Sequence, residues 1–506
     1  MQQDIVLARK VGGGSRPLPF LGLRERLAYR ALIGLVTTVG DGSRGDHGAF
    51  RKAPLEVEDC RYVLKTDIAA FYQYIDHERL VDEVVAQTGD DLAISTAIEL
   101  MQASSGRRFG LPQMSVASDA LAEVYIDPMR RDLVRAGYSV WRFADDFRVA
   151  CPNYGSALAA LELSERSAYS LGLVLNESKT STPGRDTYAE SLSEVDRAER
   201  ELFALAHGET PSAADTEGED KDEEDDQESE VLSIENFFML ALQDYDDLED
   251  DEEESLGDVG GDDEDKGVDT EDADEEEAED PEPPSERQVR AAQHLLELWA
   301  DRQDDGELAS EIDWSRAAWS VLLRKALAVL SDAKDEVGIE YVSSLLVYEP
   351  DITPQVCSYM SALADAFPSS VSSILDEVCE RQVVSAWQSV WIAYCAGAVS
   401  TPRGGDQPGH VSWLRTRLND SHGSVAAQAA LTLAQRRLLD VTEATETYAR
   451  VPAVHKQTAF LAMAAASGQV GKEAPSNDKI EALLAAWVQS QQWGRPVIPR
   501  TSKRRK

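Results

Sequence analysis

A long acidic tract divides this chain, and no other sequence feature restricts its fold as strongly. Residues 217–286 hold 36 Asp and Glu but only two lysines. The tract therefore carries −34 of the net charge of −44, which leaves −10 for the rest of the 506 residues. Dense like charge with few apolar groups prevents core formation. We predict an acidic disordered linker over 208–286, with a folded part on either side of it.

Within this linker, residues 231–242 form an apolar island that is long enough for three helical turns. Such a patch can dock on a partner or on a basic surface of the same chain. After the second folded part, residues 491–506 form a basic tail that ends in Lys503-Arg504-Arg505-Lys506. The tail can either touch phosphate or be a loose end.

The remaining composition indicates a soluble cytosolic protein. No apolar run approaches the length of a membrane span, and the N-terminus lacks a signal-peptide core. The cysteines include no close pair, so we expect small buried side chains in a reducing compartment. They are Cys60, Cys151, Cys357, Cys379 and Cys395.

In residues 1–207, strands and helices interleave, which indicates an α+β domain with helices on one face of a sheet. Strand-like runs end at Asp67, flank Asp145 and Asp146, and precede Asn176. Helical periodicity covers residues 23–36, 77–87, 90–104, 115–135, 156–170 and 188–207. Asp76 is well placed to cap the second of these helices.

Adjacent carboxylates at Asp145 and Asp146 sit at the tip of a predicted hairpin, between apolar and aromatic residues. Two like charges on such a turn repel each other, and a divalent cation is the usual means of neutralising them. Asp67, at the end of an earlier strand, supplies a third carboxylate. The alternative for the hairpin alone is an ordinary solvated tip.

Two loops of the first part can meet a polar ligand. Residues 12–15, Gly-Gly-Gly-Ser, precede Arg16 and can cradle phosphates, or they are a plain loop before a solvated basic helix. Residues 106–113 leave the amide of Gln113 exposed at a helix entrance.

The second folded part, residues 287–490, has Leu and Ala at helical spacing and short polar turns. Helices of this kind in succession suggest an α-solenoid. Residues 424–434 look like the inner helix of a HEAT-type repeat. We therefore predict an all-α, HEAT-like repeat domain.

The first part resembles the fingers and palm of reverse transcriptases, a right-hand-like polymerase fold, through four motifs in the family's order. The first catalytic motif is similar to residues 65–72 with 75–77. Residues 110–113, Gly-Leu-Pro-Gln, resemble the nucleotide-facing loop, and residues 143–146, Phe-Ala-Asp-Asp, resemble the catalytic hairpin. Residues 171–180 resemble the lysine-bearing motif that follows it.

The resemblance implies site roles. Asp67, Asp145 and Asp146 would bind two Mg²⁺ ions, or Mn²⁺ in their place, and the Ile68 carbonyl would be an auxiliary ligand. Lys179 would neutralise or protonate the pyrophosphate. Tyr72 would be the steric gate against a 2′-hydroxyl, and Gln113 would contact the incoming nucleotide. Arg16 would hold the triphosphate, and Arg51 or Lys52 are further candidates for that role.

Two features depart from the family pattern. Met114 stands where many members have glycine and would crowd the minor-groove side of the nascent pair. A helical thumb is absent from its usual place, because the chain after residue 207 runs into the acidic tract.

A reverse-transcriptase palm joined to helical repeats is similar to the abortive-infection and other defence-associated reverse transcriptases of bacteria. The resemblance implies a DNA polymerase, RNA-directed or template-independent, that serves antiphage defence. Implied partners are dNTPs, an RNA or DNA template-primer, and a second copy or another protein on the helical repeats. Alternatives are a retron-like or group II intron-like enzyme, or a non-catalytic scaffold with a polymerase-like palm.

Overall fold

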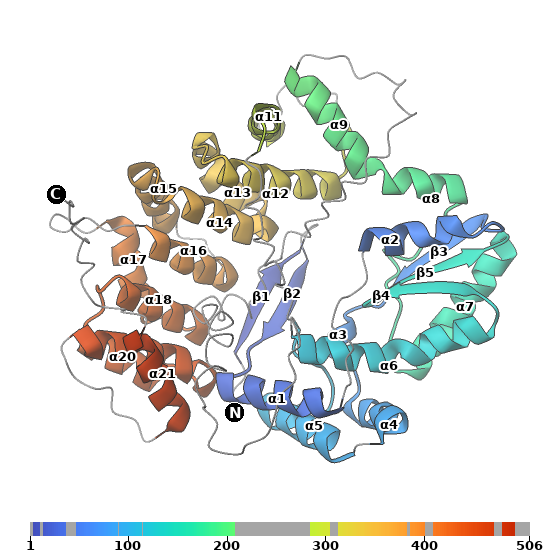
Figure 1. The fold of residues 1–506 in the computed structure, drawn as a ribbon, viewed down its shortest axis with the longest axis horizontal. Coiled ribbons are helices and arrows are strands. Elements are labelled where there is room, and N and C mark those ends of the chain that lie inside the picture. The colour runs from blue at the N-terminus through green and yellow to red at the C-terminus, as the bar shows by residue number, and fades with distance from the viewer. Residues whose placement is uncertain are drawn as a thin grey trace, which may run out of the picture.

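The computed structural model describes residues 4–10, 14–36, 47–89, 91–113, 115–207, 284–303, 312–381, 385–399, 408–469 and 478–490 (Figure 1). The predictions for the acidic linker over 208–283, for its island at 231–242, for the tail at 491–506 and for Met114 fall outside these residues. None of the helices in the described ranges combines the length and apolar character that a membrane crossing needs.

Three antiparallel strands form the central sheet of the first part, in the order β3-β5-β4. They are β3 (Tyr62–Asp67), β4 (Ser139–Phe143) and β5 (Asp146–Cys151). Side chains of a strand alternate between the faces of its sheet. Leu64, Phe147 and Val149 therefore join the main core on one face, while Val63 and Ala150 join a smaller cluster on the other.

Helices cover both faces of this sheet. The helices around the main core are α1 (Leu23–Val36), α3 (Phe71–Tyr74), α4 (His77–Thr88), α5 (Asp91–Ser105), α6 (Val116–Arg135) and α7 (Tyr154–Ser170). On the opposite face lie α2 (His47–Lys52), η1 (Ala53–Glu56) and α8 (Arg185–Leu192). The smaller cluster on that face was not expected, since the sequence indicated helices on one face.

The start of α4 follows the predicted capping chemistry. The Asp76 side chain accepts a hydrogen bond from the backbone N–H of Arg79 at 3.0 Å, which satisfies a donor that the helix leaves unpaired. Gly89 ends the helix with φ +76°, the left-handed conformation that glycine adopts easily.

The prediction of one helix over residues 188–207 is wrong. The structure has α8 and then α9 (Glu194–His207), with a break at Ser193. The two pack against different partners. Tyr188 of α8 donates to the Arg51 carbonyl of α2, while α9 packs on two helices of the second part, α11 (Glu286–Gln303) and α12 (Arg316–Asp332). One straight helix cannot reach both.

The second part is all-helical in its described residues. Its longer helices are α11 (Glu286–Gln303), α12 (Arg316–Asp332), α13 (Val342–Tyr348), α14 (Thr353–Leu363), α15 (Pro368–Glu380), α16 (Ala386–Ala398), α17 (Gly409–Arg417), α18 (Gly423–Gln435), α19 (Val441–Arg450), α20 (Lys456–Gln469) and α21 (Lys479–Ser490). Short 3₁₀ turns are η3 (Val337–Tyr341), η4 (Pro350–Ile352) and η5 (Ala453–His455).

These helices stack in sequence order. Neighbouring contacts run from α12 to α14, α16, α18 and α20, while α13, α15 and α17 follow one another beside that row. Their apolar faces form one continuous core, in which all of Cys357, Cys379 and Cys395 are buried. Cys60 and Cys151 of the first part are buried as well, as predicted.

An N-terminal hairpin, β1 (Ile5–Arg9) with β2 (Ser15–Pro19), lies between the two parts (Figure 1). This hairpin was not predicted, because β2 holds two prolines and each lacks a backbone donor. Val6, Ala8, Leu18 and Phe20 belong to the core of the C-terminal helices and not to that of the palm.

Candidate functional site

The carboxylates gather at one end of the palm sheet because of strand register. Asp67, the last residue of β3, is paired directly with Asp146, the first residue of β5. Asp145 occupies the turn between β4 and β5, next to Ala144 with φ +51°. The N–H of Ile68 donates to the Asp145 carbonyl at 3.2 Å, which ties this turn to the end of β3. The predicted juxtaposition of the three acids therefore follows from backbone pairing.

Asp67 is held from both sides by the segment that follows α7. Lys179 Nζ donates to Asp67 Oδ1, and Asn176 Nδ2 donates to Asp67 Oδ2, both at 2.9 Å. The backbone N–H of Asn176 also donates to the Asp67 carbonyl at 2.7 Å. Asp67 is buried. The sequence predicted Lys179 for this site, but it did not single out Asn176 as a partner of the carboxylate.

The charges of the site are unbalanced around Asp145. Burial, and then the negative charges of Asp67 and Asp146, raise the pKa of Asp145 to about 6. Burial alone would lower the pKa of Lys179, but its bond to Asp67 and the nearby acids raise it. Lys179 is thus cationic at neutral pH, and a single lysine does not neutralise three carboxylates.

Asp146 and Asp67 share their face of the sheet with two basic side chains. Lys65 and Arg148 are paired one step further along β3 and β5. Arg148 is buried, its guanidinium lies 5.1 Å from the centre of the Phe50 ring, and it approaches Asp146 Oδ1 at 3.5 Å. Burial, followed by the charge of Arg148, lowers the pKa of Lys65. Arg148 thus forms an ion pair with Asp146 on this face of the sheet.

The donor set is of the type that a hard divalent cation prefers. Oxygen ligands from a few carboxylates, together with substrate oxygens, are how Mg²⁺ is usually bound. The raised pKa of Asp145 reflects burial first and then the like charges of Asp67 and Asp146, which a cation would offset. As the side chains of the described residues stand, no group of three or more His, Cys, Asp or Glu converges on one metal position. Asp67 instead faces Lys179 and Asn176.

Tyr72 lies beside this site and is fixed by an acid that the sequence did not reveal. The Tyr72 hydroxyl donates to Asp119 Oδ1 of α6 at 2.5 Å, and the ring packs edge-on against Phe71 at 5.4 Å. The loop before α6 approaches the same residue, since the N–H of Leu111 donates to the Tyr72 carbonyl at 2.7 Å. Gly110 has φ +90°, and a side chain there would press on the Gln73 carbonyl.

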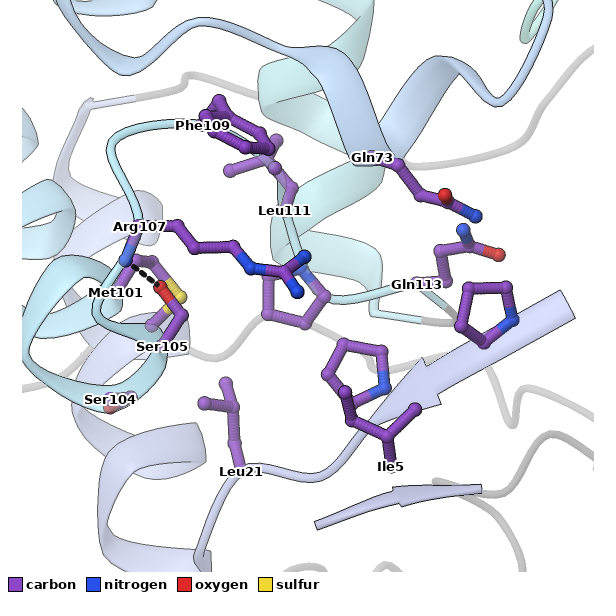
Figure 2. Close-up of a pocket in the computed structure, with 14 residues that line it drawn as sticks. Ile5, Leu21, Gln73, Met101, Ser104, Ser105, Arg107, Phe109, Leu111 and Gln113 are labelled. Atoms are coloured by element: carbon purple, nitrogen blue, oxygen red, sulfur yellow. Dashed lines mark hydrogen bonds between the residues drawn. The ribbon is translucent and has the colours of Figure 1, made fainter. Parts of the chain in front are cut away.

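Gln113 lines an open pocket of about 600 Å³ between the palm and the N-terminal hairpin. Figure 2 shows its side chain pointing toward that of Gln73, with Arg107 and Phe109 on the opposite wall. Phe109 is partly exposed and stacks on Tyr74 with ring centres 6.4 Å apart and planes 9° apart. The Arg107 guanidinium lies 5.9 Å from the Phe109 ring centre. The pocket thus combines flat aromatic faces, a cation and amides.

Arg16 is exposed on β2, and Lys10 lies just after β1. Burial, followed by the charges of Arg16 and Lys179, lowers the pKa of Lys10, whereas Asp145 and Asp67 act in the opposite direction. The hairpin therefore brings Lys10 within electrostatic reach of the carboxylates. Lys10 was missed by the sequence reasoning, because nothing in it distinguishes this lysine until the hairpin is known. Arg51 and Lys52 are on α2, which covers the same face of the sheet as Lys65 and Arg148, and the charge of Arg51 also acts on Lys65.

A family model described as reverse transcriptase (RNA-dependent DNA polymerase) matches residues 29–187. The matched segment runs from within α1 into α8 and contains the three carboxylates, Tyr72, Gln113 and Lys179. This domain indicates an RNA-directed DNA polymerase, which is a nucleotidyltransferase. It implies nucleotide substrates and a nucleic-acid template-primer. No curated protein matches the chain.

Proposed function

We propose that this protein is a reverse-transcriptase-like DNA polymerase of bacterial antiphage defence, with its catalytic centre at Asp67, Asp145 and Asp146. The observation that carries the proposal is the pairing of Asp67 with Asp146 at the sheet end, with Asp145 in the adjoining turn. The donation from Lys179 to Asp67 supports it further.

Nucleotidyl transfer needs positioning and charge neutralisation more than covalent chemistry from the protein. Asp67, Asp145 and Asp146 would hold two Mg²⁺ ions, which when bound offset the charge that develops on the attacking and leaving oxygens. Lys179 already lies at the carboxylates and carries a proton at neutral pH. It would donate that proton to the leaving pyrophosphate.

The nucleotide would be positioned from several sides. The Tyr72 ring would exclude a 2′-hydroxyl, and Asp119 fixes the orientation of that ring through its hydroxyl. The Ile68 carbonyl would be an auxiliary ligand, and Gln113 would contact the base pair. Arg16 and Lys10 would bind the triphosphate from the hairpin, which is consistent with the electrostatic coupling of Lys10 to the acids.

The pocket beside Gln113 would receive the unpaired template strand. Aromatic faces stack on any base, and arginine adds a cation–π or phosphate contact. Phe109 and Arg107 present this chemistry at the pocket wall, and Tyr74 stacks on the Phe109 ring. The same groups would serve RNA or DNA.

The defence role rests on the combination of the polymerase domain with stacked C-terminal helices. The ordered stacking from α12 to α20 supports HEAT-like repeats. Such an array would provide the surface for a second copy or another protein. A plaque assay in a bacterial host tests the role: phage should be restricted by the wild-type chain and not by one that carries Asp145→Ala and Asp146→Ala. Equal plating on both would contradict it.

The activity is tested with purified protein, labelled dNTPs and Mg²⁺, with and without an RNA template. Incorporation should occur in the wild type and be lost in the doubly substituted protein. Incorporation that requires the template indicates copying, and incorporation without it indicates template-independent synthesis. If the doubly substituted protein incorporates as well as the wild type, the assigned centre is wrong.

A further inference from the structure

The β1–β2 hairpin is attached to the C-terminal helices rather than to the palm that it faces. Its inward side chains Val6, Ala8 and Leu18 lie in the core of the C-terminal helices, and β1 contacts α16 and η4. The matched reverse transcriptase domain begins at residue 29, after the hairpin. The position of the hairpin is therefore set by a part of the chain outside that domain.

One buried polar contact fixes the base of the hairpin. His455 Nε2 and Asp4 Oδ2 are 2.7 Å apart, and the backbone N–H of Ser424 donates to the same oxygen at 3.1 Å. The N–H of Phe20 donates to the Asp4 carbonyl at 2.9 Å, so the first and last residues of the hairpin are joined there. The Phe20 ring meets His455 edge-on, with centres 5.1 Å apart.

The surroundings leave little room for this contact to shift. The His455 side chain is 2% exposed and that of Asp4 is 13% exposed. At Gly423, where α18 begins, a Cβ would lie 2.8 Å from His455 Cδ2 and 2.5 Å from Pro452 Cδ. Glycine at this position lets η5 approach α18 closely enough for both His455 and Ser424 to reach Asp4.

The hairpin also forms part of the pocket that Gln113 lines, and its cations lie within electrostatic reach of the carboxylates. The N–H of Lys10 donates to the Gly14 carbonyl at 2.9 Å, and Lys10 and Arg16 interact electrostatically with each other. Ile5, Pro17 and Pro19 of the hairpin line the same pocket as Gln113. Any movement of the hairpin base would displace these groups relative to the carboxylates.

We propose that the C-terminal helical part is a component of the nucleotide site, because His455 and Ser424 hold the hairpin through Asp4 and thereby position Arg16 and Lys10. Asp4 and His455 are positioning residues in this scheme. The proposal rests on the proposed polymerase function, in which Arg16 and Lys10 bind the triphosphate.

Steady-state incorporation kinetics of Asp4→Ala and His455→Ala test the proposal in the full-length protein. The KM for dNTP should rise roughly tenfold in each variant, because displacement of a binding group by about 1 Å weakens positioning. The double variant should be no worse than Asp4→Ala alone, since that substitution already removes the contact with His455. His455→Gln, which keeps a side-chain donor, should recover much of the affinity.

The matched control is Lys325→Ala, which removes a 2.8 Å ion pair between α12 and Glu199 of α9. This pair also joins the two parts of the chain, but it lies away from the hairpin. Its KM for dNTP should stay within about twofold of the wild type. A rise equal to that of His455→Ala would mean a general loss of domain packing and would overturn the proposal.

A double-mutant cycle shows whether His455 acts through Lys10 and Arg16, the cations of the hairpin. In a protein that already carries Lys10→Ala and Arg16→Ala, His455→Ala should change the KM for dNTP less than about twofold. A full tenfold rise in that background would contradict the proposal.

Hydrogen exchange separates this proposal from the polymerase assignment. In His455→Ala the amides of residues 5–9 and of Ser15, Arg16 and Leu18 should exchange faster, while those of 62–67 and 146–151 keep their wild-type rates. Unchanged protection of the hairpin would refute the anchor. If the wild type incorporates no nucleotide, the polymerase function fails while the exchange result still decides the anchor.

Discussion

The carboxylates of the palm and the β1–β2 hairpin face the same site, but contacts of very different range in sequence hold them. Asp67 and Asp146 are brought together by the register of adjacent strands, and the Asp145 turn is tied to Ile68 next to Asp67. The hairpin depends on a pair, Asp4 and His455, whose members are 451 residues apart. The carboxylates are thus brought together within one domain, whereas in the proposed scheme positioning of the triphosphate would depend on the other end of the chain.

The largest effect is expected at the carboxylates of the palm, where Lys179 contacts Asp67. Lys179→Ala should lower kcat on the order of 100-fold at saturating dNTP, because general-acid assistance to the leaving group is lost. Single-turnover incorporation measures the effect. Lys179→Arg, which keeps the charge beside Asp67, is the control and should retain more activity. An unchanged kcat in Lys179→Ala would remove the lysine from the chemistry.

Burial of the Asp145 carboxylate, together with its repulsion by Asp67 and Asp146, should also cost stability when no metal is present. Asp145→Asn should stabilise the metal-free protein by about 1–3 kcal/mol at pH 8, since a shift of one pKa unit corresponds to 1.36 kcal/mol. Denaturant unfolding with a chelator present checks this value.

The pH dependence of that gain has a fixed sign. The folded-state pKa of Asp145 is raised from 3.8 to about 6, so its ionised form is disfavoured in the folded state. Below 3.8 the carboxyl is protonated in both states, and the substitution should gain nothing. The gain should grow between these two values and be complete above about 6. A gain that is independent of pH would contradict the electrostatic origin.

Discrimination between dNTP and rNTP would depend on the Tyr72 ring and should show a moderate effect. Asp119→Ala removes the hydrogen bond from the Tyr72 hydroxyl to Asp119 and should lower discrimination of dNTP over rNTP by roughly tenfold, with Tyr72→Ala giving a larger loss. The ratio of kcat/KM for the two nucleotides measures it. If Tyr72→Ala relaxes selection and Asp119→Ala does not, the ring is held by its packing alone.

The smallest effect is expected for template binding in the pocket that Phe109 lines. Phe109→Ala should weaken binding of a single-stranded template about fivefold, because one stacking face is lost. Fluorescence anisotropy of a labelled oligonucleotide measures the change, and Phe109→Tyr, which keeps the ring, should bind as the wild type does. Equal binding by Phe109→Ala would place the template elsewhere.

The sequence was sufficient where local pattern and strand register determine the result. Alternation around Asp145 predicted the hairpin, and the capping signal at Asp76 predicted the start of α4. It was insufficient where packing between distant segments decides. Strand β2 was not predicted because Pro17 and Pro19 are unfavourable in strands, and no periodicity connects Asp4 to His455. Asp119 and Asn176 look like ordinary polar residues until the fold places them against Tyr72 and Asp67.

Incorporation of a labelled dNTP by wild type and by Asp67→Asn tests the catalytic centre most directly. The substitution keeps the size of the side chain that Lys179 and Asn176 contact but removes its charge. The wild type should extend a primer in Mg²⁺, and the variant, if folded as judged by thermal unfolding, should be inactive. A folded Asp67→Asn protein that extends the primer at the wild-type rate would contradict the assignment.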